Sequence, residues 1–376
     1  MIEATGLLFL TLAAAKPPPP SAPVADLSPV LAAARREHRV PGLVAVVTDR
    51  ERVIAEGAAG VRVINRPAPM RVGDLVHIGS ITKPFTATLL ATLVDQGRLR
   101  WETTLAEALP DLVPAMKPDY RSVSLAQLLS HEAGVQPFED DGSPEFRGIP
   151  VVPGDARAQR HRFAAYALSL EPVSPPGTAF RYSNAGVTIA AAMAEGVTGR
   201  PWEELLRERV LVPLGATTAG VGWPNVRDAQ APWGHMEKDG TLVPTPPDDP
   251  YKLPAWTAPA GDLSMSLPDL ARLARLHLNG VDGKAGLVRP ETIRVMHTKR
   301  LRGGLGWGVS TLLGHDVSTF SGSAGTFIAM IALVHDADLA VMVAGNAGDA
   351  DAEAAVKDVL KALIVRFAGD RSPSPQ

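Results

Sequence analysis

The chain has 376 residues, of which 45% are hydrophobic and 20% charged, so it carries enough apolar material for a large folded core. Its 37 Lys and Arg against 40 Asp and Glu give a net charge of −3, which argues against a dedicated nucleic-acid-binding protein. The sequence contains no cysteine, which excludes disulfides, thiol nucleophiles and cysteine-bound metals.

The first 25 residues are predicted to lie outside the folded body. Residues 6–15 form an apolar run too short to span a bilayer, and Ala13 and Ala15 stand in the A-x-A arrangement that precedes signal-peptide cleavage. A structureless N-terminus is the alternative, because the segment before the run carries Glu3 and no Lys or Arg. The proline-rich residues 16–23 predict an extended spacer. We therefore expect an exported protein, periplasmic or extracellular, with the cytoplasm as the alternative.

The folded body is expected to begin at about residue 26 with a helix, a β-hairpin and another helix. The first helix has apolar residues at helical spacing, and the hairpin strands flank a charged turn. The second helix is followed by glycine, a residue type that commonly ends helices. These elements cover residues 26–39, then 42–48 with 52–58, then 80–96.

The middle of the chain predicts helices, and the C-terminal part predicts strands followed by a last helix. The helices of the middle are expected over residues 124–130, 188–198, 202–211 and 268–279. The C-terminal elements are expected as strands over 318–320, 327–334 and 339–344 and a helix over 351–367.

Strands near both chain ends with helices between them predict a mixed α/β (α+β) fold. One antiparallel sheet, built from both chain ends, would be flanked by helices. We expect residues 26–84 and 291–369 to form this sheet domain, residues 85–290 to form a mostly helical insertion, and residues 370–376 to form a solvated tail. No internal repeat is visible, which excludes a solenoid.

The sharpest chemical signal is Ser80-Ile81-Thr82-Lys83, at the start of a predicted helix. Residues three apart share a helix face, and a helix N-terminus favours a developing oxyanion. Lys83 could accept the Ser80 proton if burial lowers the pKa of its amine. It is the only lysine between residues 17 and 116, in a chain with far more Arg than Lys, and arginine cannot lose its proton. Alone, the pattern could also be a capping serine beside a solvated lysine.

Further motifs follow in order along most of the chain. The tripeptide Tyr182-Ser183-Asn184 lies inside PPGTAFRYSNAGV, and VHIGSITKPFTATLLATLVDQGRL surrounds Ser80. The remaining segments are SLAQLLSHEAGV, RPWEELLRERVLVPLGAT, PAGDLSMSLPDLARLARLHLNG, GLGWGV and FSGSAGTF. In these segments the sequence resembles the serine β-lactamase and penicillin-binding-protein superfamily. Within it, the resemblance is to the class C-like branch, which includes DD-carboxypeptidases, D-aminopeptidases and family VIII esterases.

The resemblance implies a role for each site residue. Ser80 would be the acylated nucleophile, and Lys83 and Tyr182 would share the general acid and base work. A neighbouring ammonium would lower the pKa of the Tyr182 phenol. Asn184 would hydrogen-bond Lys83 and the acyl group of the substrate, and the backbone N–H groups of Ser80 and Ser323 would form the oxyanion hole.

One segment departs from the family pattern. The third family motif begins with Lys or His, whereas the aligned triplet here is Phe320-Ser321-Gly322. In the resembling β-lactamases and DD-peptidases, that cation helps to hold a substrate carboxylate. Family VIII esterases commonly carry Trp there, which is also aromatic and uncharged, so Phe320 favours a neutral, ester-like substrate. His315 would restore the charge if the register of this strand differs.

Other familiar sites are absent from the sequence. It has no G-x-S-x-G nucleophile turn and no Walker A loop, and no two of its nine histidines lie within ten residues of each other. We therefore expect no metal and no cofactor. His131, at the end of a short predicted helix, is expected to be structural.

Together these observations predict a serine acyl hydrolase that works through a covalent acyl-enzyme, with a small carboxylic ester as the favoured substrate. The alternatives within the class are a β-lactamase, a D-Ala-D-Ala carboxypeptidase and a D-aminopeptidase. A catalytically weak binding protein on the same fold is the alternative outside it. The expected partner is a small ester, amide or lactam, with no nucleic acid and no transmembrane span, and the sequence leaves the oligomeric state open.

Overall fold

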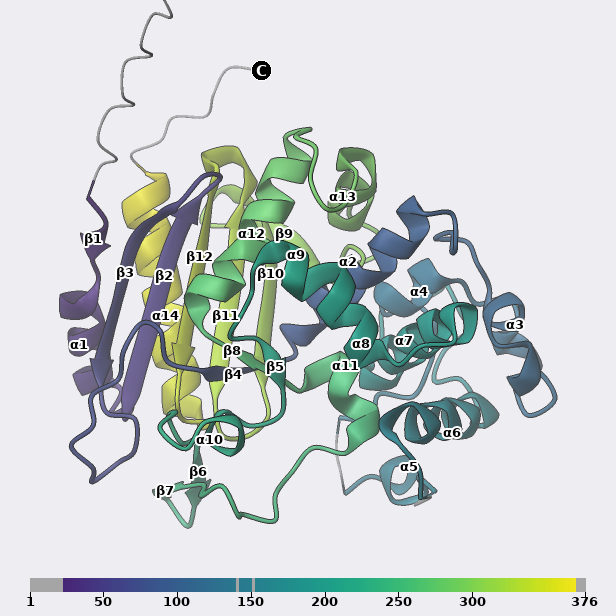
Figure 1. Ribbon diagram of the computed structural model, residues 1–376, viewed down its shortest axis with the longest axis horizontal. Coiled ribbons are helices and arrows are strands. Elements are labelled where there is room, and N and C mark those ends of the chain that lie inside the picture. The colour runs from purple at the N-terminus through teal and green to yellow at the C-terminus, as the bar shows by residue number, and fades with distance from the viewer. Residues whose placement is uncertain (1–22, 140–141, 151–152, 370–376) are drawn as a thin grey trace, which may run out of the picture.

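The computed structural model describes residues 23–139, 142–150 and 153–369, so the signal-like segment before residue 23 and the tail 370–376 lie outside the described residues. Its centre is a seven-stranded sheet made from both chain ends, which confirms the predicted mixed α/β fold (Figure 1). Neighbouring strands are antiparallel except β1 and β3. In spatial order the strands are β1 (Ala25–Asp26), β3 (Val53–Gly60), β2 (Gly42–Asp49), β12 (Leu339–Gly345), β11 (Ile328–Val334), β10 (His315–Ser323) and β9 (Gly308–Leu312).

The central strands are apolar along nearly their whole length because both faces of the sheet are covered. Successive side chains of β2 alternate between two cores, with Val44 and Val46 in one and Ala45 and Val47 in the other. On the Ala45 side, the sheet is covered by α1 (Ser28–Glu37) and α14 (Ala350–Ala368). On the Val44 side, it contacts α12 (Leu267–Val281) and β4 (Val76–Gly79).

The remaining helices lie mostly beside the Val44 side of the sheet, where α2 (Thr82–Asp95) is buried on nearly all sides (Figure 1). They are α3 (Leu105–Ala108), α4 (Leu125–Leu129), α5 (Pro144–Arg147), α6 (Ala156–Ser169), α7 (Asn184–Thr198), α8 (Trp202–Leu206), α9 (Val212–Leu214), α10 (Pro224–Arg227), α11 (Ala258–Gly261) and α13 (Pro290–His297). Two small sheets complete the described part: β4 with β8 (Leu263–Met265) and β5 (Gly220–Val221), and β6 (His235–Lys238) with β7 (Thr241–Pro244). Over the described ranges, none of the helices combines the length and the apolar character that crossing a bilayer requires.

Several boundaries differ from the sequence prediction for identifiable reasons. Helix α7 begins at Asn184 rather than 188, because the Ser183 side chain caps it by accepting from the Gly186 N–H at 3.0 Å. Helix α12 continues past Gly280, where a Cβ would come within 2.7 Å of the Ile293 side chain, so this glycine serves close packing rather than a helix end. Strand β10 is longer than 318–320 because it pairs on both sides. The prediction also missed several elements altogether, of which α6 and α13 are the longest.

Candidate active site

Ser80 lies at the junction between β4 and α2, half-buried at the start of the helix. Gly79, the residue before it, has a positive φ of 51°, and a Cβ there would come within 2.5 Å of the Ser323 nitrogen. Only glycine permits this backbone approach between β4 and β10. The local sequence thus places the Ser80 hydroxyl at the helix N-terminus and beside the end of β10.

Lys83 is fully buried one turn further along α2. Its Nζ lies 2.9 Å from Ser80 Oγ, 2.8 Å from Asn184 Oδ1 and 2.7 Å from the Ala260 carbonyl oxygen. Burial lowers the pKa of the Lys83 amine to about 7, against a smaller opposing effect of the Glu139 charge. At neutral pH a large share of Lys83 is therefore unprotonated and able to accept a proton.

Tyr182 and Asn184, at the start of α7, contact Ser80 and Lys83. The Tyr182 hydroxyl donates to Ser80 Oγ at 2.8 Å, and the Tyr182 ring lies 4.8 Å from Lys83 Nζ. Burial raises the pKa of the Tyr182 phenol above its ordinary value of 10, although the Ser80 hydrogen bond opposes this. The expectation that a neighbouring ammonium lowers this pKa was wrong, because the cluster is too deeply buried.

The hydrogen bonds of the cluster fix how protons can move. A neutral Lys83 amine keeps two donors, which suit Asn184 Oδ1 and the Ala260 carbonyl, and uses its lone pair toward Ser80. Ser80 then donates its proton to Lys83 while accepting from the Tyr182 hydroxyl. This arrangement can deprotonate Ser80 through Lys83, and it holds a protonated Tyr182 ready to donate.

The end of β10 lies directly beside Ser80. A Cβ at Gly322 would come within 2.6 Å of the Ser80 nitrogen, so this glycine lets the strand lie directly against the Ser80 backbone. Ser323 follows it at the last position of β10. The backbone nitrogens of Ser80 and Ser323 are therefore brought close together, as a pair of oxyanion donors requires.

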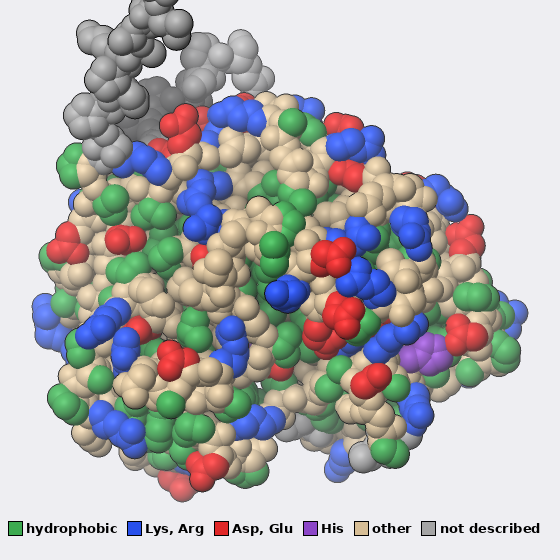
Figure 2. All heavy atoms as spheres, viewed as in Figure 1, with side chains coloured by type: hydrophobic (Ala, Val, Ile, Leu, Met, Phe, Trp, Pro, Cys, Tyr) green, Lys and Arg blue, Asp and Glu red, His purple; other side chains and the backbone are tan. Residues whose placement is uncertain are grey.

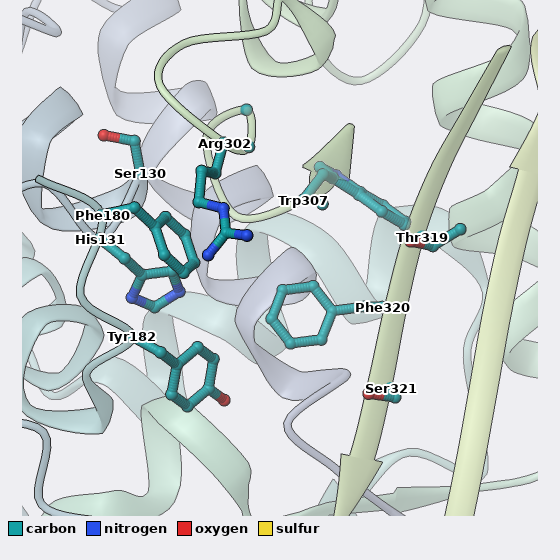
Figure 3. Close-up of a pocket in the computed structure, with 12 residues that line it drawn as sticks. Ser130, His131, Phe180, Tyr182, Arg302, Trp307, Thr319, Phe320 and Ser321 are labelled. Carbon is teal, nitrogen blue, oxygen red and sulfur yellow. The ribbon is translucent and has the colours of Figure 1, made fainter. Parts of the chain in front are cut away.

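The cleft continues on both sides of Ser80. On the side of Asn184 and Ser323, a cavity of about 480 Å³ also includes Ser80, Glu139 and Lys252 in its lining. On the tyrosine side, a second cavity of about 240 Å³ is lined by Ser130, His131, Phe180, Tyr182, Arg302, Gly303, Gly304, Trp307, Gly308, Thr319, Phe320 and Ser321 (Figure 3). Phe320 faces this second cavity, with its ring 6.0 Å from Lys83 Nζ.

The sequence-predicted residues thus meet in one place, but three wall residues went unpredicted as parts of the site. His131 has its ring 4.6 Å from that of Tyr182, and its Nδ1 accepts from the Ser183 N–H at 3.2 Å. Arg302 and Glu139 lie on loops, and no sequence motif marks either one. His315 begins β10 and pairs with Asp336 at 3.0 Å without lining either cavity, so it does not supply the missing third-motif charge.

Histidines distant in sequence do come together, at a different place. Thr88, His277, His297, Ser318 and His335 form a continuous hydrogen-bonded chain with spacings of 2.7–2.9 Å. No group of three or more His, Cys, Asp or Glu side chains with metal-binding geometry occurs among residues 23–139, 142–150 and 153–369. We call the five residues the histidine chain; none of them lines the two cavities beside Ser80.

Comparison with known proteins agrees with this geometry. A family model described as Beta-lactamase matches residues 27–366. Penicillin-binding protein 4 of Amycolatopsis lactamdurans is 28% identical over 91% of this chain and 89% of its own length. Esterase EstB of Burkholderia gladioli is 29% identical over 59% of each chain. A D-aminopeptidase of Cereibacter sphaeroides is 27% identical over 87% of this chain and 60% of its own length.

Solved structures show the same fold. The octameric penicillin-binding protein homologue from Pyrococcus abyssi superposes with a TM-score of 0.74 at 24% identity, covering 92% of this chain and 78% of the other. A class C beta lactamase from Rhodobacter sphaeroides superposes with a TM-score of 0.71 at 20% identity, covering 90% of this chain and all of the other. At these identities the likeness concerns the fold, and the chemistry has to be argued from the site.

Proposed function

Because the chain belongs to the Beta-lactamase family of serine hydrolases, we propose that it hydrolyses a small carboxylic ester through a covalent intermediate on Ser80. One observation carries the proposal: the Ser80 hydroxyl lies within hydrogen-bond distance of both a buried Lys83 amine and the Tyr182 hydroxyl. A nucleophile, an adjacent proton acceptor and a protonated acid in mutual contact are what acyl transfer requires.

Acylation follows from this arrangement. The Lys83 amine takes the Ser80 proton as Oγ attacks the ester carbonyl carbon. The carbonyl oxygen becomes negative and receives the backbone N–H groups of Ser80 and Ser323. The ester C–O bond then breaks, and Tyr182 donates its proton to the leaving oxygen, with Lys83 returning a proton to Tyr182.

Deacylation reverses the same relay with water in place of the alcohol. Lys83, again neutral, accepts a proton from a water molecule that attacks the acyl carbon through the position the alcohol has left. The bond between the acyl carbon and Ser80 Oγ breaks, and Ser80 recovers its proton from the Lys83 and Tyr182 pair. The products are a carboxylic acid and an alcohol.

The preference for an ester rests on Phe320. A phenyl ring stands where a cation would hold a carboxylate next to the scissile bond, and burying an unpaired carboxylate against that ring is costly. An ester without such a group avoids this cost. EstB, one of the similar proteins, is named as an esterase, which supports this choice of substrate class.

A D-amino-acid amidase is the second candidate, favoured by Glu139. This carboxylate lines the cavity on the Asn184 side together with Ser80 and Asn184, and it interacts electrostatically with Lys83. An acidic group at that end could bind the ammonium group of an amino-acyl substrate. One similar protein is named as a D-aminopeptidase, which supports this second candidate.

Covalent labelling tests the proposal. Intact-mass spectrometry after treatment with a fluorophosphonate should show one adduct on the wild type and none on Ser80→Ala. Ser321→Ala is the matched control, since it removes another hydroxyl near the cleft, and it should still be labelled. Labelling that persists in Ser80→Ala contradicts the assignment, and a folded wild type with no adduct and no turnover favours the binding-protein alternative.

Substrate preference is tested by comparing kcat/KM for p-nitrophenyl butyrate and nitrocefin. We expect the wild type to prefer the ester, and Phe320→His to shift the ratio toward nitrocefin by roughly tenfold or more, as a new charged hydrogen bond would. Adding D-alanine p-nitroanilide to the panel tests the amidase candidate. A wild type that prefers nitrocefin, or a ratio that Phe320→His leaves unmoved, contradicts the role given to Phe320.

A further inference from the structure

The cavity on the tyrosine side of Ser80, which we call the Arg302 pocket, has an unusual polar composition. Arg302 is its one charged side chain, and no Asp or Glu contributes to its lining. Aromatic rings of Phe180, Trp307 and Phe320 form much of the rest. The pocket is therefore apolar around its sides and positive at one place, which fits a ligand with a ring or chain ending in an anion.

Arg302 is placed to meet such an anion. Its guanidinium lies 5.8 Å from the Phe180 ring and points into the space between Phe180 and Phe320 (Figure 3). Two residues earlier, Arg300 pairs with Glu132 at 3.2 Å. By contrast, among the residues that the structure describes, no carboxylate lies within ion-pair distance of Arg302.

His131 adds a buried donor on the same wall. Its Nδ1 accepts from the Ser183 backbone N–H, so the neutral ring carries its proton on Nε2. Burial and the nearby Lys83 lower the pKa of His131 to about 3, which keeps the ring neutral. His131 is 7% exposed, and within the described ranges its Nε2 has no hydrogen-bond partner. A buried N–H without an acceptor is costly, so an acceptor oxygen that a ligand brings to it would be stabilising.

Trp307 repeats this pattern on another wall. It is 2% exposed, it lines the Arg302 pocket, and its indole N–H has no acceptor among the described residues. Arg302, His131 and Trp307 thus all have N–H donors in one small pocket, and no carboxylate lines it. N–H donors in a pocket whose lining contains no carboxylate are complementary to a carboxylate, which has two acceptor oxygens and no donor.

We propose that the Arg302 pocket is a subsite for a carboxylate on the leaving group of the substrate, held by Arg302 and completed by the N–H groups of His131 and Trp307. The inference rests on the proposed function and narrows its substrate class. Tyr182 lines this pocket and Asn184 lines the other, so the group that Tyr182 protonates on departure lies here and the acyl group lies on the far side.

The subsite is compatible with Phe320. In a β-lactam the carboxylate is attached beside the scissile bond, where it would meet the phenyl ring. An ester whose alcohol carries its carboxylate several bonds away can pack its carbon framework on Phe320, Phe180 and Trp307 and reach Arg302 with its charge. The chain would therefore select esters by the position of the negative charge as well as by its presence.

Two aryl acetates test this selection. 4-Acetoxybenzoate and 4-acetoxybenzamide transfer the same acetyl group and differ in the charge at the far end of the leaving phenol. Each kcat/KM is divided by the hydroxide-catalysed rate of the same ester, which removes intrinsic reactivity. We expect the wild type to favour the benzoate by roughly tenfold to a hundredfold, the usual size of a charge-assisted hydrogen bond.

Substitutions at Arg302 should remove that preference selectively. In Arg302→Gln the benzoate-to-benzamide ratio should fall roughly tenfold or more while the benzamide rate changes little, and Arg302→Lys should retain part of the ratio. The matched control is Arg66→Gln, which removes an arginine stacked at 4.2 Å on Trp233 outside the cleft and should leave the ratio unchanged. A ratio that survives Arg302→Gln, or an equal loss for both substrates, overturns the proposal.

A binding measurement separates failure of the subsite from failure of the proposed function. Ser80→Ala should bind 4-acetoxybenzoate more tightly than 4-acetoxybenzamide by calorimetry, and Ser80→Ala with Arg302→Gln should lose the difference. This readout needs no turnover. Equal affinities would refute the subsite even in an active enzyme, whereas a charge preference in a protein that no fluorophosphonate labels would refute only the hydrolase mechanism.

Discussion

Helix α2 serves two buried polar networks that differ in what they can do. At its first turn, Lys83 joins Ser80, Tyr182 and Asn184, which together we call the Ser80 cluster. Five residues later, Thr88 begins the histidine chain. In both networks burial lowers the pKa of basic groups, yet one opens onto two cavities and the other opens onto neither of them. A perturbed pKa therefore does not by itself mark a reaction centre.

The hydrogen-bond directions explain the difference. The Thr88 hydroxyl donates to the Pro84 carbonyl, so it must accept from His277 Nε2–H. The same logic runs through His297, Ser318 and His335, so that each imidazole carries its proton on Nε2 and every inner link has one donor and one acceptor. Every link between its five members is therefore made, and at its outer end His335 Nδ1 has no partner among the described residues. The Ser80 cluster, in contrast, holds a half-buried hydroxyl between a proton acceptor and a proton donor.

The largest expected effect comes from changing Lys83. Lys83→Arg keeps the charge but cannot accept a proton at any working pH, so kcat for p-nitrophenyl butyrate should fall by about 10²–10⁴, nearly as far as in Lys83→Ala. Circular dichroism should show that both variants remain folded. If Lys83→Arg hydrolyses the ester at close to the wild-type rate, Lys83 is an electrostatic or structural residue and the contrast between the two networks disappears.

The pH dependence of turnover should report the same amine. Because the pKa of Lys83 is lowered to about 7, the neutral and active form is lost as the pH falls below that value. We expect kcat/KM to decrease about tenfold per pH unit on the acid side, reaching about a hundredfold at pH 5. The Tyr182 phenol, with a raised pKa, should add no inflection below pH 10. A flat profile between pH 5 and 8 would contradict Lys83 as the base.

At the histidine chain, acid should lower the free energy of unfolding rather than the rate of turnover. Burial lowers the pKa of His277 to about 3 and lowers the pKa values of His297 and His335 as well. These histidines therefore bind protons more readily in the unfolded polypeptide than in the folded protein. Their contribution to the free energy of unfolding is fully present above pH 6.5 and is lost as the pH falls toward 3. For His277 the cost at pH 5 is about 2 kcal/mol.

Urea melts at pH 7.5, 6 and 5 measure this loss, and His277→Phe should reduce its pH dependence. The other charged groups near the chain act mainly at its outer end, where Asp316 and Asp336 raise and Arg50 lowers the pKa of His335. A free energy of unfolding that stays constant from pH 7.5 to 5 would show that the pKa values of these histidines are not lowered in the folded protein.

The sequence motifs brought out Ser80, Lys83, Tyr182 and Asn184, which the structure places in contact, but not the histidine chain, and the reason is physical. Ser80 and Lys83 lie on one helix turn, and Tyr182 and Asn184 lie around one helix start, so short motifs report them. The chain collects residues from 88 to 335 on separate elements, and only the packing of α2, α12, α13 and the sheet brings them together. Likewise, the direction in which Arg302 points is a property of a folded loop, which no spacing pattern encodes.

The pKa of Tyr182 shows the same limit within the motif itself. The sequence motifs suggested that the Lys83 ammonium would lower the pKa of the Tyr182 phenol. That effect requires Lys83 to stay charged. Both side chains are buried in one cluster, so desolvation raises the pKa of the phenol and lowers the pKa of the amine together. Burial depends on the whole fold, and a motif gives the identity of the reacting groups without their protonation states.

The smallest expected effect is that of Thr88→Val, which can be compared with Lys83→Ala on the same helix, α2. Thr88→Val is nearly isosteric and removes the hydroxyl that accepts from His277, leaving a buried N–H without a partner, which costs about 1–3 kcal/mol. The melting temperature should fall by a few degrees, while kcat/KM for p-nitrophenyl butyrate at 25 °C stays within about twofold of the wild type. Lys83→Ala, five residues earlier, should show the opposite pattern, with activity lost and stability retained or improved because a buried amine is removed. If Thr88→Val lowers kcat as strongly as it lowers stability, the histidine chain is coupled to the reaction centre through α2, and the two networks have to be treated as one.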